Sequence, residues 1–92
     1  MIDKNVRTLE LYYLPTCPYC AKVRSFIERE GIKNIAEHDI TNGEELKELL
    51  RINHGNRQVP CLVVNGEPML ESDDIIEFLA ELKANKEADR AV

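Results

Sequence analysis

The sequence is poor in several features that mark common classes of protein. It has no tryptophan, 5% aromatic residues and three cysteines among 92 residues. Such a small, odd number of cysteines does not suit a secreted disulfide scaffold. No apolar run approaches the roughly 18 residues of a membrane-spanning helix. Residues 1–7 are charged and lack the apolar segment of a signal peptide. We therefore expect neither a membrane span nor a signal peptide.

Positive charge is also scarce. There are 12 lysines and arginines against 17 aspartates and glutamates, and the net charge is −5. Nucleic acids and anionic membranes attract positive surfaces, so we expect no binding to either. No repeat, low-complexity stretch or linker divides the chain. We expect one cytoplasmic, monomeric domain over 1–92, with its core over 8–82 and a fraying tail over 83–92.

Hydrophobic patterning predicts alternating strands and helices. The apolar run before Pro15 is typical of a buried strand, and Val23, Phe26 and Ile27 recur at helical spacing. The predicted strands are 8–14, 34–40, 61–64 and 67–70, and the predicted helices are 18–30, 41 to 53–55, and 72–82. The order β-α-β-α-β-β-α predicts an α/β fold, with a four-stranded mixed sheet flanked by helices.

Short local motifs predict where these elements begin and turn. Thr41 and Glu44 fit a capping box at the start of the second helix, and Ser72 is expected to cap the third. Asn65-Gly66 is the strongest two-residue hairpin signal. Pro68 places the last strand at an edge of the sheet, because proline has no amide hydrogen for a ladder.

The spacing of Cys17 and Cys20 carries the most chemical information. Cys17-Pro18-Tyr19-Cys20 follows the first strand and opens the first helix. Free amides and the helix dipole stabilise a thiolate there, and lower the pKa of a cysteine from about 8.5 to about 3.5–7.5. Pro18 costs no hydrogen bond at the first helical position. We expect an exposed nucleophile at Cys17 and a more buried resolving thiol at Cys20.

Two cysteines at this spacing also form half of a zinc site. There is no second such pair, and Cys61, His38 and His54 lie at spacings unlike a zinc finger. Thiol redox chemistry is therefore favoured, and no metal is expected. We expect Cys61 to be a small buried side chain, both histidines to be surface residues without partners, and Tyr12 and Tyr13 to serve packing.

A helix start at Ser72 and Asp73 is a candidate binding site. Its free amides can bind a carboxylate, and the aspartate can hold an ammonium group, so the end of an α-amino acid suits it. A well-capped helix without a ligand has the same sequence.

The residues around Pro60 form the second candidate segment. Arg57 and Gln58 can reach a ligand carboxylate, although solvated loop residues look the same. A cis Val59-Pro60 bond would present the Val59 backbone to an extended peptide. From the residues alone an ordinary trans proline is favoured, since only about 5–6% of such bonds are cis.

These motifs, in this order, resemble a dithiol glutaredoxin from Thr8 to about Leu82. The resemblance implies a thioredoxin-like fold, a cis Val59-Pro60 bond, and glutathione as co-substrate. Cys17 would be the nucleophile and Cys20 the resolving thiol. Leu14 stands where many glutaredoxins have lysine, and Gln58 where threonine is common. We therefore expect Arg57 or Gln58 to bind the glycyl carboxylate of glutathione. The implied glutathione-binding residues are Tyr19, Arg57, Gln58, Val59, Pro60, Ser72 and Asp73.

Residues 59–72 also resemble the N-terminal domain of glutathione transferases, although we do not expect the all-helical second domain of a transferase. The expected function is a glutathione-dependent oxidoreductase that reduces protein–glutathione mixed disulfides and protein disulfides. A reductant fed by thioredoxin reductase, an iron–sulfur carrier and a zinc or scaffold module are the alternatives. Cluster carriers of the family usually have a single-cysteine CGFS motif, and Pro18 argues against that role.

Overall fold

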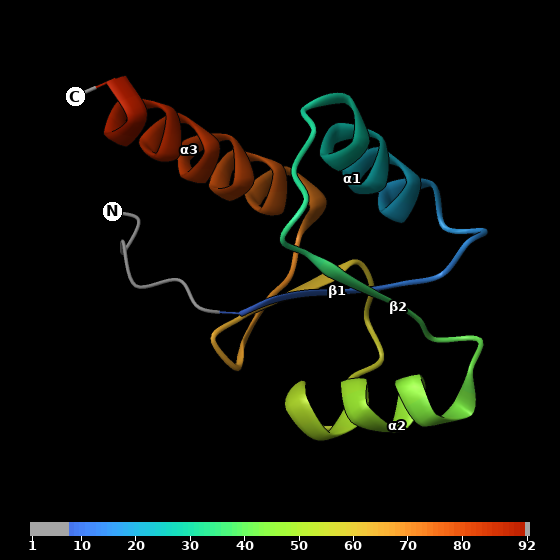
Figure 1. Ribbon diagram of the computed structural model, residues 1–92. Helices are drawn as coiled ribbons and strands as arrows, with labels where there is room; N and C mark the ends of the chain where they lie inside the picture. Colours follow the sequence, from blue (N-terminus) through green and yellow to red (C-terminus); the bar gives the residue numbers. More distant parts are fainter. Residues whose placement is uncertain (1–7, 92) are drawn as a thin grey trace.

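Four strands form one mixed sheet in the order β2-β1-β3-β4 (Figure 1). The computed structural model describes residues 8–91, with side chains through residue 84. The elements are β1 (Leu9–Tyr13), α1 (Pro18–Arg29), β2 (Ala36–Asp39), α2 (Gly43–Ile52), β3 (Cys61–Val64), β4 (Glu67–Met69) and α3 (Ser72–Ala91). Strand β1 runs parallel to β2 and antiparallel to β3, and β3 pairs antiparallel with β4. The predicted α/β fold is confirmed.

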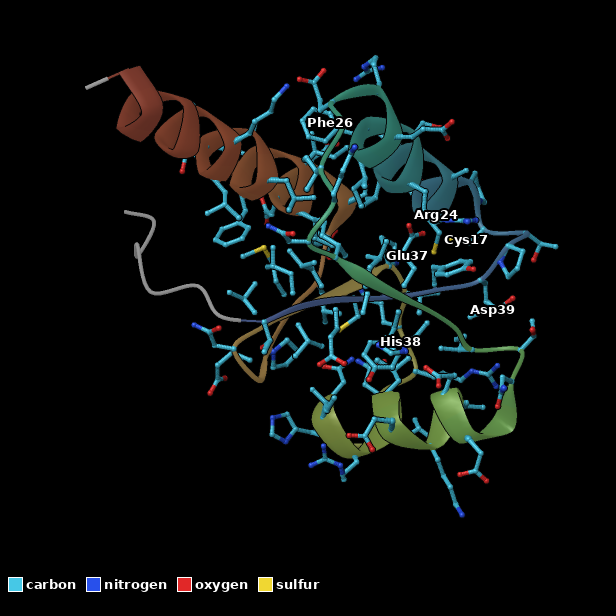
Figure 2. All side chains as sticks on the ribbon, in the orientation of Figure 1. Cys17, Arg24, Phe26, Glu37, His38 and Asp39 are labelled. Carbon is cyan, nitrogen blue, oxygen red and sulfur yellow. The ribbon has the colours of Figure 1, made fainter. Side chains whose placement is uncertain are left out.

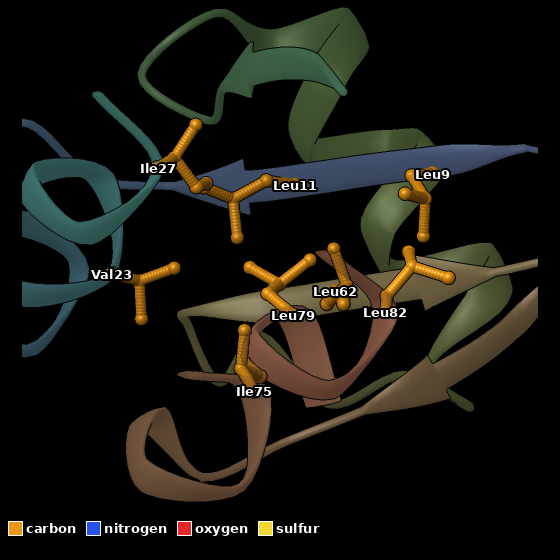
Figure 3. Packing of buried hydrophobic residues seen from close by; sticks show 8 residues of the cluster. All are labelled: Leu9, Leu11, Val23, Ile27, Leu62, Ile75, Leu79 and Leu82. Atoms are coloured by element: carbon orange, nitrogen blue, oxygen red, sulfur yellow. The ribbon is translucent and has the colours of Figure 1, made fainter. Parts of the chain in front are cut away.

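The central strands β1 and β3 are buried on both faces. Helices α1 and α3 cover one face of the sheet and α2 covers the other (Figure 1). Successive strand residues point to opposite faces, so Leu11 and Leu62 meet α1 and α3, whereas Tyr12 and Val63 meet α2. Figure 3 shows the first core, which contains Leu9, Leu11, Val23, Ile27, Leu62, Ile75, Leu79 and Leu82. Because helices pack on both faces of β1, the end of this strand has a fixed position, and the cysteine pair comes directly after it in the sequence.

The turn between β3 and β4 has the conformation that its sequence predicts. Asn65 and Gly66 have φ angles of 51° and 89°, as a two-residue hairpin turn of type I′ requires. The Asn65 side chain also accepts a hydrogen bond from the Thr8 amide at 3.0 Å. Pro68 lies in β4 at the edge of the sheet, as predicted.

Both predicted helix caps are wrong by one residue. Asn42, not Thr41, caps α2, and its side chain accepts a hydrogen bond from the Glu44 amide at 2.9 Å. The Thr41 hydroxyl donates instead to Asp39, at 2.7 Å. At α3 the Glu71 carbonyl accepts the first helical hydrogen bond, so Ser72 lies inside the helix. In each case the preceding loop, which the local motif does not describe, decides the position of the cap.

Helix α3 is longer than the sequence predicts. The predicted helix ends near Leu82 and residues 83–92 fray, whereas the structure continues the helix to Ala91. The extension is rich in alanine and lysine, which favour helix, and it has no glycine or proline. Lys83 also pairs with Glu30 at the end of α1, at 3.2 Å. Between residues 8 and 91, no helix is long and apolar enough to cross a membrane.

We expect Asn42→Ala to lower the free energy of unfolding by about 1 kcal/mol, because it leaves an amide of the first turn of α2 without its acceptor. Thr41→Ala is the matched control, since it removes only an exposed side-chain contact with Asp39. Urea unfolding of both variants provides the measurement. A larger loss from Thr41→Ala than from Asn42→Ala would show that the cap lies at Thr41.

Candidate active site

Cys17 lies at the junction between β1 and α1. It is the N-cap residue of the helix, with extended backbone angles, and Pro18 follows at the first helical position. The Cys17 amide donates to the Leu14 carbonyl at 3.1 Å, and its carbonyl accepts from Ala21 at 3.0 Å. The side chain is half-buried, while Cys20, one turn later, is fully buried. Cys20 is the more buried thiol, as predicted, but Cys17 is half-buried and not exposed as expected.

The two thiols have opposite pKa shifts. Burial on its own raises the pKa of Cys17, but hydrogen bonds from the backbone and thiol of Cys20 and from the backbone of Tyr19 outweigh it, and the net effect lowers that pKa. Burial raises the pKa of Cys20 to about 12, and its hydrogen bond to Cys17 adds to the rise. A backbone hydrogen bond at Leu14 and the charge of Arg24 oppose this rise. The pair therefore holds its negative charge on Cys17.

A groove of about 360 Å³ is lined by Tyr19, which lies between the two cysteines in the sequence, and by residues around Pro60 and the start of α3. Its lining residues are Tyr19, Gln58, Val59, Pro60, Glu71, Ser72 and Asp73. The Val59-Pro60 peptide bond is cis, as the glutaredoxin resemblance implies. Tyr19 is 64% exposed, so this wall presents an aromatic ring to solvent. The fold brings together six residues that the sequence analysis names as glutathione-binding.

Arg57 is the one of the predicted binding residues that does not line the groove. It is exposed, as is Gln58. Asn53 is buried and stabilises the loop before Pro60. Its side-chain amide donates a hydrogen bond to the backbone carbonyl of Asn56 at 3.0 Å. The side chain of Asn56 in turn accepts from the Gln58 amide at 2.9 Å. These bonds position Gln58 at the groove.

The start of α3 contributes an ion pair that the sequence analysis missed. Lys22 of α1 contacts Asp73 at 2.5 Å, although the residues are 51 positions apart. No local pattern indicates this contact, since Lys22 looks like an ordinary residue of the outer face of α1. Glu71 also lines the groove, with a φ of 72°. The signal for Glu71 was its place directly before Ser72.

Cys61, Tyr12 and Tyr13 have the packing roles that the sequence predicts. Cys61 is fully buried, as predicted for a small core side chain, and burial raises its pKa to about 11. Tyr12 is buried and serves packing, as expected, and Tyr13 packs beneath the guanidinium of Arg24. In the part of the chain that the structure describes, no three or more His, Cys, Asp and Glu side chains cluster as metal ligands would.

His38 is not the partnerless surface residue that we predicted. Its Nε2 lies 3.1 Å from Glu10, its Nδ1 contacts Glu45, and its ring stacks on Tyr12 with centroids 4.6 Å apart. These partners come from β1 and α2. The parallel register of β1 and β2, in which Tyr12 opposes His38, brings them together. His54 is exposed, as predicted.

The fold and this site define a thioredoxin-like domain with a thiol pair at the start of its first helix and a groove beside a cis proline. Residues 11–87 match the family of glutathione S-transferase N-terminal domains, and the chain belongs to that family.

Two curated relatives match most of this chain. Glutathione S-transferase U7 of Arabidopsis thaliana is 31% identical over 78 residues, which cover 84% of this chain and 34% of that protein. Prostaglandin E synthase 2 of Danio rerio is 33% identical over 76 residues, which cover 82% of this chain and 19% of that protein. The chain thus spans about a third or less of the length of these relatives.

Solved structures show the same fold. The crystal structure of a mutant of the thioredoxin-like protein BC3987 has a TM-score of 0.65 at 22% identity, over 80% of this chain and 96% of that chain. The solution structure of glutaredoxin from Brucella melitensis has a TM-score of 0.59 at 23% identity, over 88% of this chain and 87% of that chain. Both likenesses support the thioredoxin-like fold.

We expect the reactivity of Cys17 to depend on the hydrogen bond from Cys20. Alkylation by iodoacetamide needs the thiolate, so its rate should rise with pH through a midpoint below that of an ordinary cysteine. Cys20→Ala removes the donor and should move the midpoint to higher pH, whereas Cys20→Ser keeps a hydroxyl donor and should move it less. Mass spectrometry distinguishes Cys17 from buried Cys61. A midpoint unchanged in Cys20→Ala would exclude the hydrogen bond as the cause.

Proposed function

We propose that this protein is a glutathione-dependent thiol–disulfide oxidoreductase of the dithiol glutaredoxin type. The observation that carries the proposal is the asymmetry of the thiol pair. Cys17 is half-buried with a lowered pKa, while Cys20 is fully buried with a pKa of about 12. A thiolate is the nucleophile of disulfide exchange, and a protonated neighbour stays in reserve for a second step.

In the first proposed reaction the protein removes glutathione from other proteins. The Cys17 thiolate attacks the glutathione sulfur of a protein–glutathione mixed disulfide. The protein thiol leaves as a thiolate and takes up a proton, and glutathione stays bound to Cys17 by a disulfide. The thiolate of a second glutathione attacks this glutathionyl sulfur, so that glutathione disulfide leaves and the Cys17 thiolate returns. Glutathione supplies the electrons.

In the second proposed reaction the protein reduces a protein disulfide. Cys17 attacks one sulfur and releases the other as a thiolate. Cys20 then loses its proton and attacks the sulfur of Cys17, which forms the Cys17–Cys20 disulfide and releases the reduced protein. Two glutathione molecules restore the dithiol. This route alone needs Cys20.

The groove offers complementary groups for each part of glutathione. The Val59 backbone would pair with the cysteinyl part, and Tyr19 would form one wall. Free amides at the start of α3, near Ser72, suit the carboxylate of the γ-glutamyl end, and Asp73 suits its ammonium group. The glycyl carboxylate would be bound by Gln58 of the lining. We place the reaction in the cytoplasm, where glutathione keeps thiols reduced.

Transferase activity is a second candidate, because the family is that of glutathione S-transferase N-terminal domains. A transferase bonds the glutathione sulfur to an electrophile, and this chemistry does not require a second thiol on the protein. The paired cysteines therefore favour disulfide exchange. An assay with glutathione and 1-chloro-2,4-dinitrobenzene measures the transferase reaction separately.

We expect Cys17→Ser to abolish turnover of both a glutathionylated substrate and a protein disulfide. Cys20→Ser should retain turnover of the glutathionylated substrate and lose that of the protein disulfide, since only the second route closes the pair. A coupled assay with glutathione, glutathione reductase and NADPH measures both rates.

Cys61→Ser is the control, because Cys61 is a core residue that takes no part in the proposed reactions. Activity of Cys17→Ser on the glutathionylated substrate would contradict the assigned roles. Equal turnover with thioredoxin reductase in place of glutathione and its reductase would instead favour the reductase-fed alternative.

We expect Asp73→Asn to raise the KM for glutathionylated substrates about two- to fivefold and to leave kcat unchanged, as loss of one exposed ionic contact should. Asp74→Asn is the control for charge, because it removes the same charge from the next residue, which does not line the groove. Lys22→Gln is the control for the ion pair, because it removes the partner of Asp73 and keeps the Asp73 carboxylate. Steady-state kinetics of all three variants give the comparison. Equal effects of the two aspartate substitutions would indicate general electrostatics and exclude a specific contact at Asp73.

A further inference from the structure

Arg24 lies on α1 one turn after Cys20 and has no part in the reactions proposed above. Cys20, Val23 and Ile27 form the buried face of the helix. Residues four positions apart are neighbours on a helix surface, so Arg24 adjoins Cys20 at the border of that face. The side chain of Arg24 therefore starts from the helix position next to that of the buried thiol.

Two strands hold the guanidinium of Arg24 in place. Its Nε donates to Glu37 of β2 at 2.8 Å, and its central carbon lies 4.1 Å from the centre of the Tyr13 ring at the end of β1. Figure 2 shows Arg24, Glu37 and Cys17 on the side of the sheet that α1 covers. A cation that contacts both a carboxylate and an aromatic face loses much of the freedom of an exposed arginine.

The charged groups around Arg24 determine its effect. Glu37 and Asp39 of β2 and Tyr13 of β1 raise its pKa, the hydrogen bond to Glu37 most of all, so the guanidinium stays charged. On α1 its charge opposes the rise in the pKa of Cys20 that burial causes. Arg24 is not among the groups that shift the pKa of Cys17. Its influence thus falls on one thiol of the pair.

We propose that Arg24 is a positioning residue for the second step of the dithiol reaction. Its guanidinium favours the negative charge that forms on Cys20 as this thiol attacks a mixed disulfide on Cys17, and Glu37 limits that effect by neutralising part of the charge. This role rests on the dithiol route of the proposed function.

The need for such a cation follows from the state of the pair in that step. Once Cys17 is bonded to a second sulfur it has no thiolate, so it neither accepts a hydrogen bond from Cys20 nor repels its charge. Burial of Cys20 remains as the obstacle to ionisation. Cys20 gives its proton to water and bonds to the Cys17 sulfur, and the other thiol leaves as a thiolate. Cys20 itself is fully buried, whereas the Arg24 side chain is 42% exposed, so solvent screens part of the attraction between the guanidinium and the thiolate.

The reaction with 5,5′-dithiobis(2-nitrobenzoate) separates the two steps without glutathione. Attack by Cys17 releases one thionitrobenzoate and leaves the other on Cys17 as a mixed disulfide. Attack by Cys20 then releases the second and closes the Cys17–Cys20 bond. Stopped-flow absorbance records both releases, and repetition over a range of pH gives the midpoint for each.

We expect Arg24→Gln to slow the second release about three- to tenfold near neutral pH, to move its pH midpoint upward, and to leave the first release unchanged. Arg24→Lys should retain part of the rate. Glu37→Gln keeps the cation and removes its neutralising partner, so it should speed the second release. Arg29→Gln is the charge-matched control on the same helix, with a side chain that is 69% exposed.

Several outcomes would overturn the role of Arg24. One is a second release slowed no more by Arg24→Gln than by Arg29→Gln. Another is equal slowing in Arg24→Gln and Glu37→Gln, which would mean that the ion pair serves structure. A third is equal slowing of both releases at every pH. Absence of turnover with glutathione, together with an Arg24-dependent second release, would contradict the proposed function and still support the role of Arg24 in the attack by Cys20.

Discussion

The hydrogen bond between the two thiols is the interaction on which the rest of the site depends. It forms because β1 ends directly before α1, so that Cys17 lies at the helix start and Cys20 lies one turn inside. The thiol of Cys20 donates to Cys17 and, together with backbone hydrogen bonds from Cys20 and Tyr19, lowers the pKa of Cys17. Burial is the main cause of the raised pKa of Cys20, and the same contact adds to that rise. The geometry requires that neither β1 nor α1 moves. The cores on the two faces of the sheet supply that rigidity, since β1 contributes Leu11 to one and Tyr12 to the other.

Full burial of Cys20 has opposite consequences for the two steps of disulfide exchange. A buried, protonated thiol is a good donor to a thiolate at Cys17, and so it favours the first attack. The same burial opposes ionisation of Cys20, which the second attack needs. A fixed cation beside Cys20 reduces this conflict without exposing the thiol to water. Arg24, between Tyr13 and Glu37, therefore supplies a positive charge near Cys20 although the net charge of the chain is −5.

Most of the fold follows from local sequence because its main signals are local. The turn at Asn65-Gly66, the edge position of Pro68 and the helix start at Pro18 each depend on the backbone preferences of one or two residues. The features that escaped prediction join distant segments. The pair of Lys22 and Asp73 spans 51 positions, and the partners of His38 come from other elements. A single sequence carries no signal for such contacts, whereas the residues that we propose to bind glutathione were predicted through a family resemblance, and six of the seven line one groove.

The family and the thiol pair describe different parts of the same molecule. A groove beside a cis proline and the start of a helix can bind an amino-acid-like ligand whatever reaction follows, because backbone groups and helix amides do that work. The reaction that follows binding depends on the side chains at the start of α1. A second thiol inside the helix adds a step that a single nucleophile cannot perform, since it can displace a partner from Cys17. Membership of the glutathione S-transferase N-terminal domain family is therefore compatible with a redox role, and the pair at Cys17 and Cys20 is the feature that selects it.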